Sequence, residues 1–184
     1  MKLPDYSEYL NRPDMLDWIE SEWLRNEHIH NAQADFANTV ITDLGIKSVI
    51  EIGCATGNLA KRITCEDYLG VDKNESCIKL AREKNPGKKF MVADIRSFKG
   101  KADLVCAFAI LKHFSLEELP VIIKKLMGMG SYFIFDVPIS EKTQDDGTEH
   151  NHVWLTVKDM EKMLGGKSIL KSDYYNIVEP MYLV

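Results

Sequence analysis

The sequence has few of the features that mark membrane, secreted or disordered proteins. Its 184 residues include only 6 prolines, 11 glycines and 4 cysteines, and no tract is rich in proline, glycine or serine. Neither a repeat nor a linker divides the chain, and its length suits one domain of about 100–200 residues. Apolar residues make up 45% and charged residues 28% of the chain, a composition that predicts a globular protein with a buried core.

Long hydrophobic runs and an excess of positive charge are also missing. The longest apolar stretches, such as residues 105–111, fall well short of the ~20 residues that span a membrane, and the N-terminal residues lack a signal-peptide core. Acidic residues outnumber basic residues by 28 to 23, which gives a net charge of −5, and the basic residues do not cluster. We therefore expect a cytoplasmic protein that binds neither a membrane nor nucleic acid.

The number and spacing of the cysteines argue against a disulfide framework and against a zinc site. Cys54, Cys65, Cys77 and Cys106 form no C-x-x-C pair, and no histidine follows them at the spacing of a zinc site. They are therefore predicted to be small buried residues in a reducing compartment rather than disulfide partners or zinc ligands.

Hydrophobic periodicity divides the chain into a helical N-terminal part and an alternating remainder. Apolar residues recur at helical spacing in two segments, 13–26, which opens at Pro13, and 34–44, which ends before Gly45. From residue 46 onward, short runs rich in Val, Ile and Phe alternate with helical stretches, one of them at 58–64, as in βαβ units. We predict an α/β fold in which residues 1–45 form a helical cap on the main domain, residues 46–184, within a single domain overall.

The end of the chain breaks this alternation. After a predicted helix at 156–164, the segments 167–175 and 177–184 lie too close together for a crossover helix, so we expect them to pair antiparallel. The fold class is therefore a three-layer sandwich: a Rossmann-like, mostly parallel seven-stranded sheet with helices on both faces and an antiparallel C-terminal hairpin. Residues 138–153 form the longest irregular segment, and such a loop usually has a function.

The most informative motif is Glu51-Ile52-Gly53-Cys54-Ala55-Thr56-Gly57, which follows the first predicted strand. Ligands of open α/β sheets bind at the carboxyl ends of the strands, and these small residues allow a tight turn and close approach to a ligand. Asp72 ends the second predicted strand, 72 − 51 = 21 residues after Glu51, about the spacing at which a carboxylate binds the ribose of a nucleoside. A nucleoside ligand is therefore predicted.

The pattern and charge of this turn narrow the choice of ligand. The glycine pattern is G-x-A-x-G rather than the G-x-G-x-x-G of dinucleotide sites, and Glu51 would repel a pyrophosphate. A ligand with an ammonium and a sulfonium suits this carboxylate, and the N-terminus of the helix predicted at 58–64 would receive the ligand's own carboxylate. The alternative interpretation is a bare strand-to-helix turn that binds nothing.

These motifs together resemble those of the class I S-adenosylmethionine-dependent methyltransferase family. VIEIGCATG is similar to the first motif of that family, with Ala55 in place of the middle glycine, while GVDKN, MVADI and DLVCAFAILKHF resemble its second, third and fourth strand motifs. The resemblance covers residues 46–137. It implies a methyltransferase enzyme with S-adenosyl-L-methionine as cofactor and S-adenosyl-L-homocysteine as product.

The resemblance also implies which residues contact the cofactor. The methionine part is expected against the glycine turn, the ribose and adenine at the ends of the second and third strands, and the sulfonium methyl at the end of the fourth. The corresponding residues are Glu51, Gly53, Cys54, Ala55 and Gly57 for the methionine, Asp72 for the ribose, Lys73, Asp94 and Ile95 for the adenine, and Ala107 and Phe108 for the methyl group. Ordinary surface and core positions are the alternative for Lys73 and Ile95.

Three histidines are candidate catalytic residues. His113 follows the fourth strand in ILKHF, where many family members have a histidine beside the substrate, so the resemblance implies a general base. The alternative is a hydrogen bond from His113 to the backbone near the next helix. His150 and His152 are weaker candidates in the loop 138–153, which we interpret as a lid with Trp154 as an apolar wall. A divalent-metal site in this loop is a less favoured alternative, so no metal is predicted.

The predicted N-terminal helices carry further histidines and two tryptophans. His28 and His30 are two positions apart, cannot share a helix face, and are expected to face solvent. Trp18 and Trp23 are expected either to pack these helices on the sheet or to close the substrate pocket.

The fourth-strand motif indicates a small-molecule acceptor. Its residues Ala107-Phe108-Ala109-Ile110 differ from the Asn/Asp-Pro-Pro-aromatic motif that is common in family members that methylate nucleic-acid amines. We therefore expect methyl transfer to a hydroxyl or amine of a metabolite, natural product or sugar, and a homodimer is compatible with the sequence. Two alternatives stay open: a protein or RNA methyltransferase that works with a partner, and a non-catalytic nucleoside-binding module.

Overall fold

The computed structural model describes residues 14–140, 144–145, 153–165, 170–171 and 181–184. Two helices lead into the first strands and are followed by an alternation of strands and helices. In chain order these elements are α2 (Met15–Arg25), α3 (Glu27–Asp43), β1 (Ser48–Ile52), the 3-10 helix η1 (Leu59–Lys61), β2 (Asp67–Asp72), α4 (Glu75–Lys84), β3 (Lys89–Val92) and β4 (Ala102–Ala107).

The second half of the chain completes the sheet and adds a small hairpin. Its elements are the 3-10 helix η2 (Leu111–His113), α5 (Leu119–Met127), β5 (Gly130–Asp136), β6 (Gln144–Asp145), β7 (Val153–Trp154), α6 (Val157–Met163), β8 (Leu170–Lys171) and β9 (Met181–Leu183). Strands β6 and β7 pair antiparallel in a sheet of their own. The rest of the predicted lid, residues 141–143 and 146–152, lies outside the described residues. No helix in the described ranges is long and apolar enough to cross a membrane.

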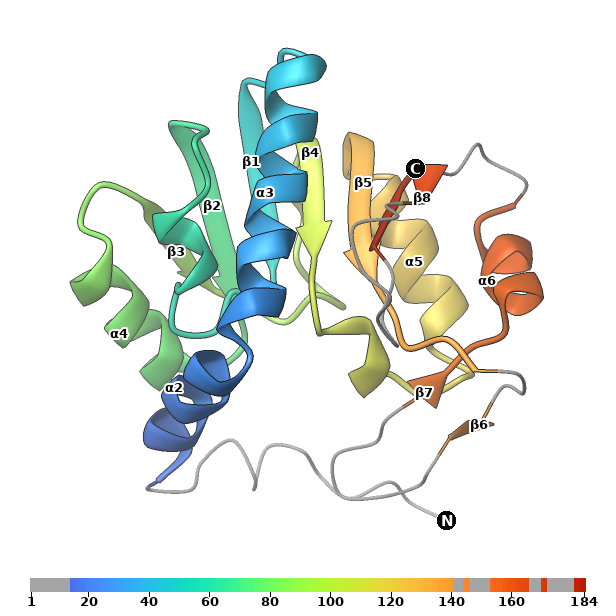
Figure 1. Cartoon of the computed structure of the whole chain (residues 1–184), viewed down its shortest axis with the longest axis horizontal. Coiled ribbons are helices and arrows are strands. Elements are labelled where there is room, and N and C mark those ends of the chain that lie inside the picture. The colour runs from blue at the N-terminus through green and yellow to red at the C-terminus, as the bar shows by residue number, and fades with distance from the viewer. Residues whose placement is uncertain (1–13, 141–143, 146–152, 166–169, 172–180) are drawn as a thin grey trace.

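Seven strands form the main sheet in the order β3-β2-β1-β4-β5-β9-β8 (Figure 1). The first five are parallel, whereas β9 pairs antiparallel with both β5 and β8. The predicted Rossmann-like sheet with an antiparallel C-terminal hairpin is therefore confirmed. The strand order reverses between β1 and β4, and in open α/β sheets such a switch point is where ligands bind.

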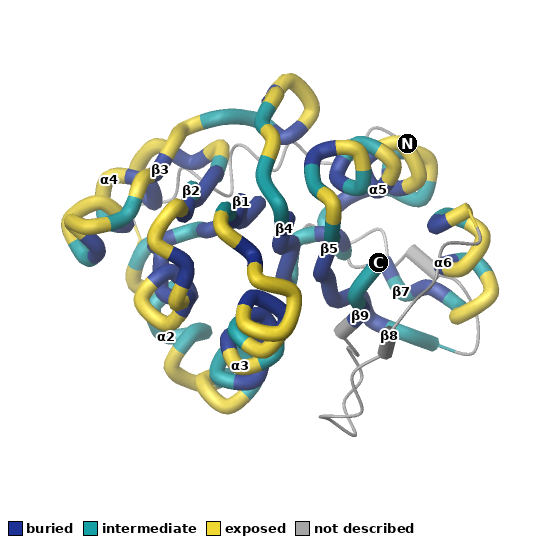
Figure 2. Tube along the Cα trace, turned by 90° about the horizontal axis from the view of Figure 1, so that it is seen from above, coloured by how far each residue is buried: buried dark blue, intermediate teal, exposed yellow. Residues whose placement is uncertain are grey.

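Helices cover both faces of the sheet, as predicted. Figure 1 shows α3 in front of β1 and β4 and α5 behind the sheet, and Figure 2 shows them on opposite sides when seen from above. Buried residues of α3 and α4 belong to one apolar cluster, and buried residues of α5 and α6 to another on the opposite face. Burial on both faces explains why central strands such as β4 are nearly continuous apolar runs.

The helix predicted directly after the glycine turn is wrong. Residues 58–64 contain only the short 3-10 helix η1. Residues 58–66 connect the turn to β2, and a helix of that length would rise only about 14 Å. The six residues of β2 extend about 20 Å, so the connection has to run in a more extended form to reach the start of the strand. Helix α3 covers this face of the sheet instead, with Ala37 and Ile41 buried against it.

Candidate functional site

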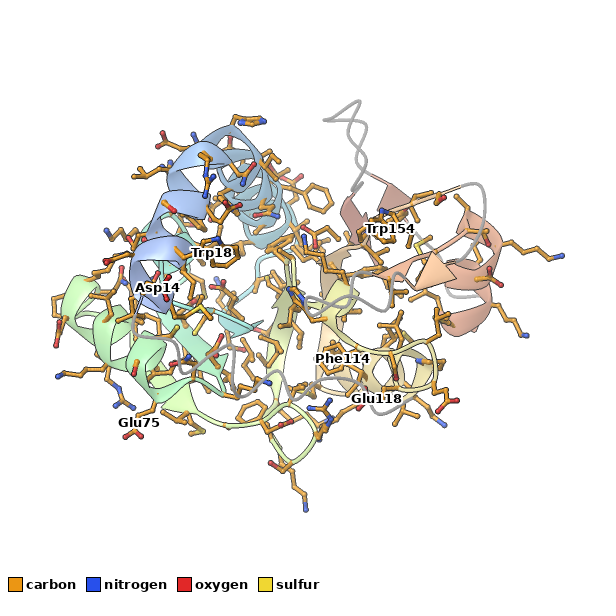
Figure 3. The ribbon with its side chains drawn as sticks, turned by 90° about the horizontal axis from the view of Figure 1, so that it is seen from below. Asp14, Trp18, Glu75, Phe114, Glu118 and Trp154 are labelled. Carbon is orange, nitrogen blue, oxygen red and sulfur yellow. The ribbon has the colours of Figure 1, made fainter. Side chains whose placement is uncertain are left out.

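A cavity of about 610 Å³ lies at the carboxyl ends of the parallel strands. Its walls come from α2, α3, the glycine turn, the ends of β2 and β3, and the segment after β4. In Figure 1, α2 lies at the edge of the sheet toward which β4 points; Figure 3 looks onto that edge, with Trp18 on α2 and Phe114 after η2 on different sides of the site. The volume falls within the range of about 300–1,000 Å³ that is typical of small-molecule sites.

Three carboxylates line one end of this cavity. Glu51 is in β1, Asp72 ends β2 and Asp94 follows β3. Because β3, β2 and β1 are neighbours in the sheet, the three carboxylates form a row along the carboxyl ends of the strands. We call Glu51, Asp72 and Asp94 the acidic row.

Burial raises the pKa of two members of the acidic row, Glu51 and Asp72. Glu51 is only 5% exposed, and desolvation raises its pKa to about 7; a hydrogen bond from the Tyr68 hydroxyl opposes this shift, and the Asp72 carboxylate adds to it. Desolvation also raises the pKa of Asp72, against the hydrogen bonds that its carboxylate accepts from backbone N–H groups. A cationic ligand at this end of the cavity would offset the cost of ionising these buried groups.

The glycine turn adopts the left-handed backbone conformation at three positions. Gly53, Ala55 and Gly57 have φ angles of +76°, +44° and +72°. For alanine this conformation costs about 1–2 kcal/mol. The Ala55 N–H donates to Asp72 Oδ2 at 3.0 Å, and this bond joins the turn to the end of β2. At Gly53 a Cβ would lie 2.9 Å from Ile110, so the turn and the segment after β4 meet closely beside the cavity.

Most of the predicted cofactor residues line the cavity, but two do not. Ala107 is fully buried in the core. Gly57 faces α4, where a Cβ would lie 2.8 Å from Asn85 Nδ2, and this amide donates to the Gly57 carbonyl at 3.0 Å. Gly57 therefore serves to pack the turn against α4. The predicted cofactor residues that do line the cavity are Glu51, Gly53, Cys54, Ala55, Asp72, Lys73, Asp94, Ile95 and Phe108.

The candidate catalytic residues are only partly described. His113 lies in η2 and lines the cavity, with its backbone N–H donating to the Ile110 carbonyl at 3.1 Å. His150 and His152 lie outside the described residues. Trp154 in β7 is half-buried and is not among the residues that line the cavity. Within the described part of the chain, no group of three or more His, Cys, Asp or Glu residues could hold a metal ion.

Sequence reasoning missed a polar network at the other end of the cavity, which we call the Asp136 network. Gln33 Nε2 donates to Asp136 Oδ2 at 2.6 Å, and the Ala109 N–H donates to Asp136 Oδ1, also at 2.6 Å. Gln33 Oε1 lies 2.8 Å from His30 Nδ1. The pattern of His30 and Gln33, three residues apart on one helix, is the sequence signal that could have indicated this contact.

The expectation that His30 faces solvent is wrong, whereas His28 is exposed as expected. His30 is half-buried, lines the cavity and stacks on the ring of Trp23, with ring centroids 3.8 Å apart. The reason is that Trp23, near the end of α2, stacks on His30 in the first turns of α3, because the two helices meet at Asn26. Trp18 and Trp23 both line the cavity.

Polar contacts fasten α2 over the cavity. Glu20 accepts hydrogen bonds from Thr56 Oγ1 at 2.5 Å, Asn58 Nδ2 at 2.9 Å and Lys84 Nζ at 2.8 Å. Burial acts to raise the pKa of Glu20, but the bonds from these three groups lower it overall. The carboxylate therefore links α2 to the glycine turn and to the end of α4.

Comparisons with known proteins agree with this architecture. A family model described as "Methyltransferase domain" matches residues 49–129. The trans-aconitate 2-methyltransferases of Delftia acidovorans and of an Enterobacter species are each 30% identical to this chain. The matches cover 56% and 62% of this chain, and 42% and 50% of those proteins, so they extend over half or less of these relatives.

Solved structures share the fold at lower identity. Magnesium protoporphyrin IX methyltransferase from Synechocystis, with bound S-adenosylmethionine, has a TM-score of 0.65 at 18% identity over 86% of this chain and 81% of that chain. An O-methyltransferase family protein from Burkholderia thailandensis has a TM-score of 0.74 at 13% identity, over 100% of this chain and 63% of that chain. Human N-acetylserotonin methyltransferase has a TM-score of 0.71 at 11% identity, and the match covers 97% of this chain and 56% of that chain.

The fold and the family match define an α/β methyltransferase domain. Within that class, this chain carries a class I, S-adenosylmethionine-dependent methyltransferase domain, which includes at least residues 49–129. The resemblance seen in the four strand motifs is thereby confirmed.

Proposed function

We propose that this protein transfers a methyl group from S-adenosyl-L-methionine to a hydroxyl or amine of a small molecule. The observation that carries the proposal is the acidic row of Glu51, Asp72 and Asp94 at one end of a 610 Å³ cavity. The cavity continues past the glycine turn to His113 and the Asp136 network, so one space can hold both a cofactor and an acceptor.

The residues of the acidic end fit this cofactor. Glu51 is a desolvated carboxylate that a cationic ligand group would stabilise. Asp72 uses its two oxygens to accept from the N–H groups of Ala55 and Asn74, and a carboxylate has about four acceptor sites, so it retains capacity for ribose hydroxyls. Ile95 is nearly buried beside Asp94 and offers an apolar surface to the adenine ring.

When bound, the cofactor supplies a methyl group on a sulfonium, which is a good leaving group. The protein then has to hold the nucleophile in line with the methyl group and keep water out. Positioning of this kind accounts for as much as about 7–11 kcal/mol of a reaction barrier. Helix α2 contributes both effects, since Trp18 and Trp23 line the cavity and Glu20 fastens the helix in place.

A small acceptor is supported by the enclosure of the cavity and by the relatives. Residues of helices α2 and α3 line the cavity together with His113, which its place after the fourth strand predicts as a general base. The names of two relatives specify trans-aconitate, a small molecule, as the acceptor. The alternatives are a protein or RNA acceptor supplied through a partner, and a module that binds the nucleoside without transferring its methyl group.

Binding and transfer assays test this proposal. In calorimetric titrations the wild-type protein should bind S-adenosylmethionine and S-adenosylhomocysteine, and Asp72→Asn should bind both about 10–100-fold more weakly because a charged acceptor is lost. Asp67→Asn is the matched control, since Asp67 is an exposed residue at the other end of the same strand. Binding of neither ligand by the wild type would contradict the proposal. The protein is then incubated with methyl-labelled cofactor and an extract of small molecules. An enzyme forms a labelled product, whereas a binding module forms none.

A further inference from the structure

The Asp136 network has a defined direction. Asp136 and Gln33 are each 3% exposed, so both side chains have lost nearly all contact with water. Asp136 accepts one hydrogen bond from a backbone N–H and another from the Gln33 amide. Because Gln33 Nε2 donates to Asp136, the NH₂ group of Gln33 faces Asp136 and its carbonyl oxygen faces His30.

This direction determines the tautomer of His30. The Gln33 carbonyl oxygen can only accept, and it lies 2.8 Å from His30 Nδ1, so Nδ1 carries the proton. In a neutral imidazole with its proton on Nδ1, the lone pair is on Nε2. Among the described residues, Gln33 is the only side chain that His30 hydrogen-bonds.

His30 lies at the end of the cavity away from the acidic row. If the cofactor binds at the acidic row, the end that contains His30 stays open for the acceptor. Asp136 ends β5 and Ala109 follows β4, whereas Asp72 and Asp94 lie at the ends of β2 and β3, on the other side of β1. The stacked ring of Trp23 covers one face of the imidazole, with an angle of 5° between the rings, and so fixes the plane of His30.

We propose that His30 is the general base, whose Nε2 accepts the proton of an acceptor hydroxyl during methyl transfer; this inference rests on the proposed function. The O–H bond of the acceptor and the S–CH₃ bond of the cofactor break as the O–CH₃ bond forms. The electron pair of the S–C bond stays on sulfur, which becomes the thioether of S-adenosylhomocysteine, and the proton goes to Nε2. Gln33 and Asp136 are positioning residues that act through His30.

The surroundings of His30 favour the neutral form that a base requires. Burial lowers the pKa of His30; the hydrogen bond to Gln33 opposes this, and the charges of Lys112, His28 and Arg62 lower the pKa further. Among the described residues, Glu22 on α2 and His113 on η2 also line the cavity, and Asp136 lies behind Gln33. Once Nε2 is protonated, the Nδ1–H bond to Gln33 is retained, so the network holds the imidazolium in place.

A first measurement needs no acceptor. In long-range ¹H–¹⁵N spectra of the protein saturated with S-adenosylhomocysteine at pH 7.5, His30 should show the Nδ1–H tautomer, and its signals should be missing in His30→Gln. In Gln33→Met the tautomer preference should be lost, because methionine offers no amide oxygen. An Nε2–H tautomer in the wild type would contradict the proposal. If S-adenosylhomocysteine does not bind, the proposed function fails instead, and the tautomer is still measurable in the free protein.

A second measurement tests the proton transfer with catechol and 4-nitrophenol as acceptor probes. 4-Nitrophenol ionises near neutral pH without help, whereas catechol needs a base. His30→Gln should lower kcat for catechol by about 10²–10⁴-fold, with little change in KM and a much smaller loss for 4-nitrophenol. Gln33→Met should lower kcat less and alter the pH profile. Asp35→Asn is the control, since Asp35 is an exposed residue on the same helix.

Three outcomes would overturn the assignment. Equal losses of kcat for both probes in His30→Gln would indicate a structural role. A normal kcat for catechol in His30→Gln, combined with a loss in His113→Gln, would give the base role to His113. A wild-type protein that binds the cofactor but methylates neither phenol would contradict hydroxyl chemistry at His30 and leave the cofactor site unaffected.

Discussion

Replacing Glu51 with glutamine should stabilise the free protein in alkaline solution. The pKa of this buried carboxyl is about 7 in the folded protein, against an ordinary value of 4.5. Between these two pH values the folded chain retains a proton that the unfolded chain has lost, so the free energy of unfolding falls as pH rises from 4.5 through 7. Each pH unit corresponds to about 1.4 kcal/mol, so ionised Glu51 costs the fold about 3 kcal/mol above pH 7. Glutamine has no such charge to bury.

Thermal unfolding at pH 5 and pH 8.5 measures this effect. Glu51→Gln and the wild type should have similar melting temperatures at pH 5. At pH 8.5 the variant should melt higher by as much as roughly 6–12 °C, since 1 kcal/mol corresponds to about 2–4 °C in a chain of this size. Glu66→Gln makes the same chemical change at an exposed position and should leave the pH dependence as it is in the wild type.

The same substitution should weaken cofactor binding. If the ammonium of S-adenosylmethionine pairs with ionised Glu51, binding releases a proton, and the affinity of the wild type should rise by as much as about tenfold per pH unit below pH 7. Glu51→Gln should bind more weakly and with a flatter pH dependence. Parallel stability curves for variant and wild type from pH 5 to 8.5 would refute the argument that Glu51 is a desolvated acid.

Three further substitutions test the elements that build the site. Lys84→Met should speed hydrogen exchange of the α2 amides by about tenfold or more, because Glu20 loses a charged donor; Lys89→Met, which removes an exposed ion pair, should not change it. Gly57→Ala should lower the free energy of unfolding in urea by at least about 1–2 kcal/mol, since alanine is strained at this φ angle, and an unchanged midpoint would contradict the assigned packing. Asp136→Asn should lower the free energy of unfolding by about 1–3 kcal/mol in the same assay. The asparagine has one acceptor oxygen, so its NH₂ group would face a second donor, either the Gln33 amide or the Ala109 N–H.

The sheet and the acidic row at one end of the cavity could be predicted because local patterns determine them. Short runs rich in Val, Ile and Phe, separated by helical segments, are sufficient to indicate parallel strands covered on both faces. Asp72 could be placed because it ends a strand at a fixed distance from the glycine turn. The short link before the last strand likewise required antiparallel pairing of the C-terminal hairpin.

The remaining features depend on distances and contacts between segments that are far apart in the sequence. Residues 58–64 have helical spacing, but a helix in that connection would be too short to reach the start of β2. The contact between Gln33 and Asp136 joins residues 103 positions apart, and periodicity carries no information about such a pair. The partial burial of His30 could not be predicted for a related reason, since it depends on the stacking of Trp23 from the neighbouring helix α2.

Helix α3 contributes to both the core and the candidate site, and this has a consequence for protein engineering. Its middle, around Ala37 and Ile41, fills the space left by the missing crossover helix, while His30 and Gln33 near its start border the cavity. Substitutions intended to alter the choice of substrate at those positions will therefore also change how firmly the helix is seated. Redesign of specificity should accordingly begin from a variant stabilised elsewhere, so that the fold tolerates the loss.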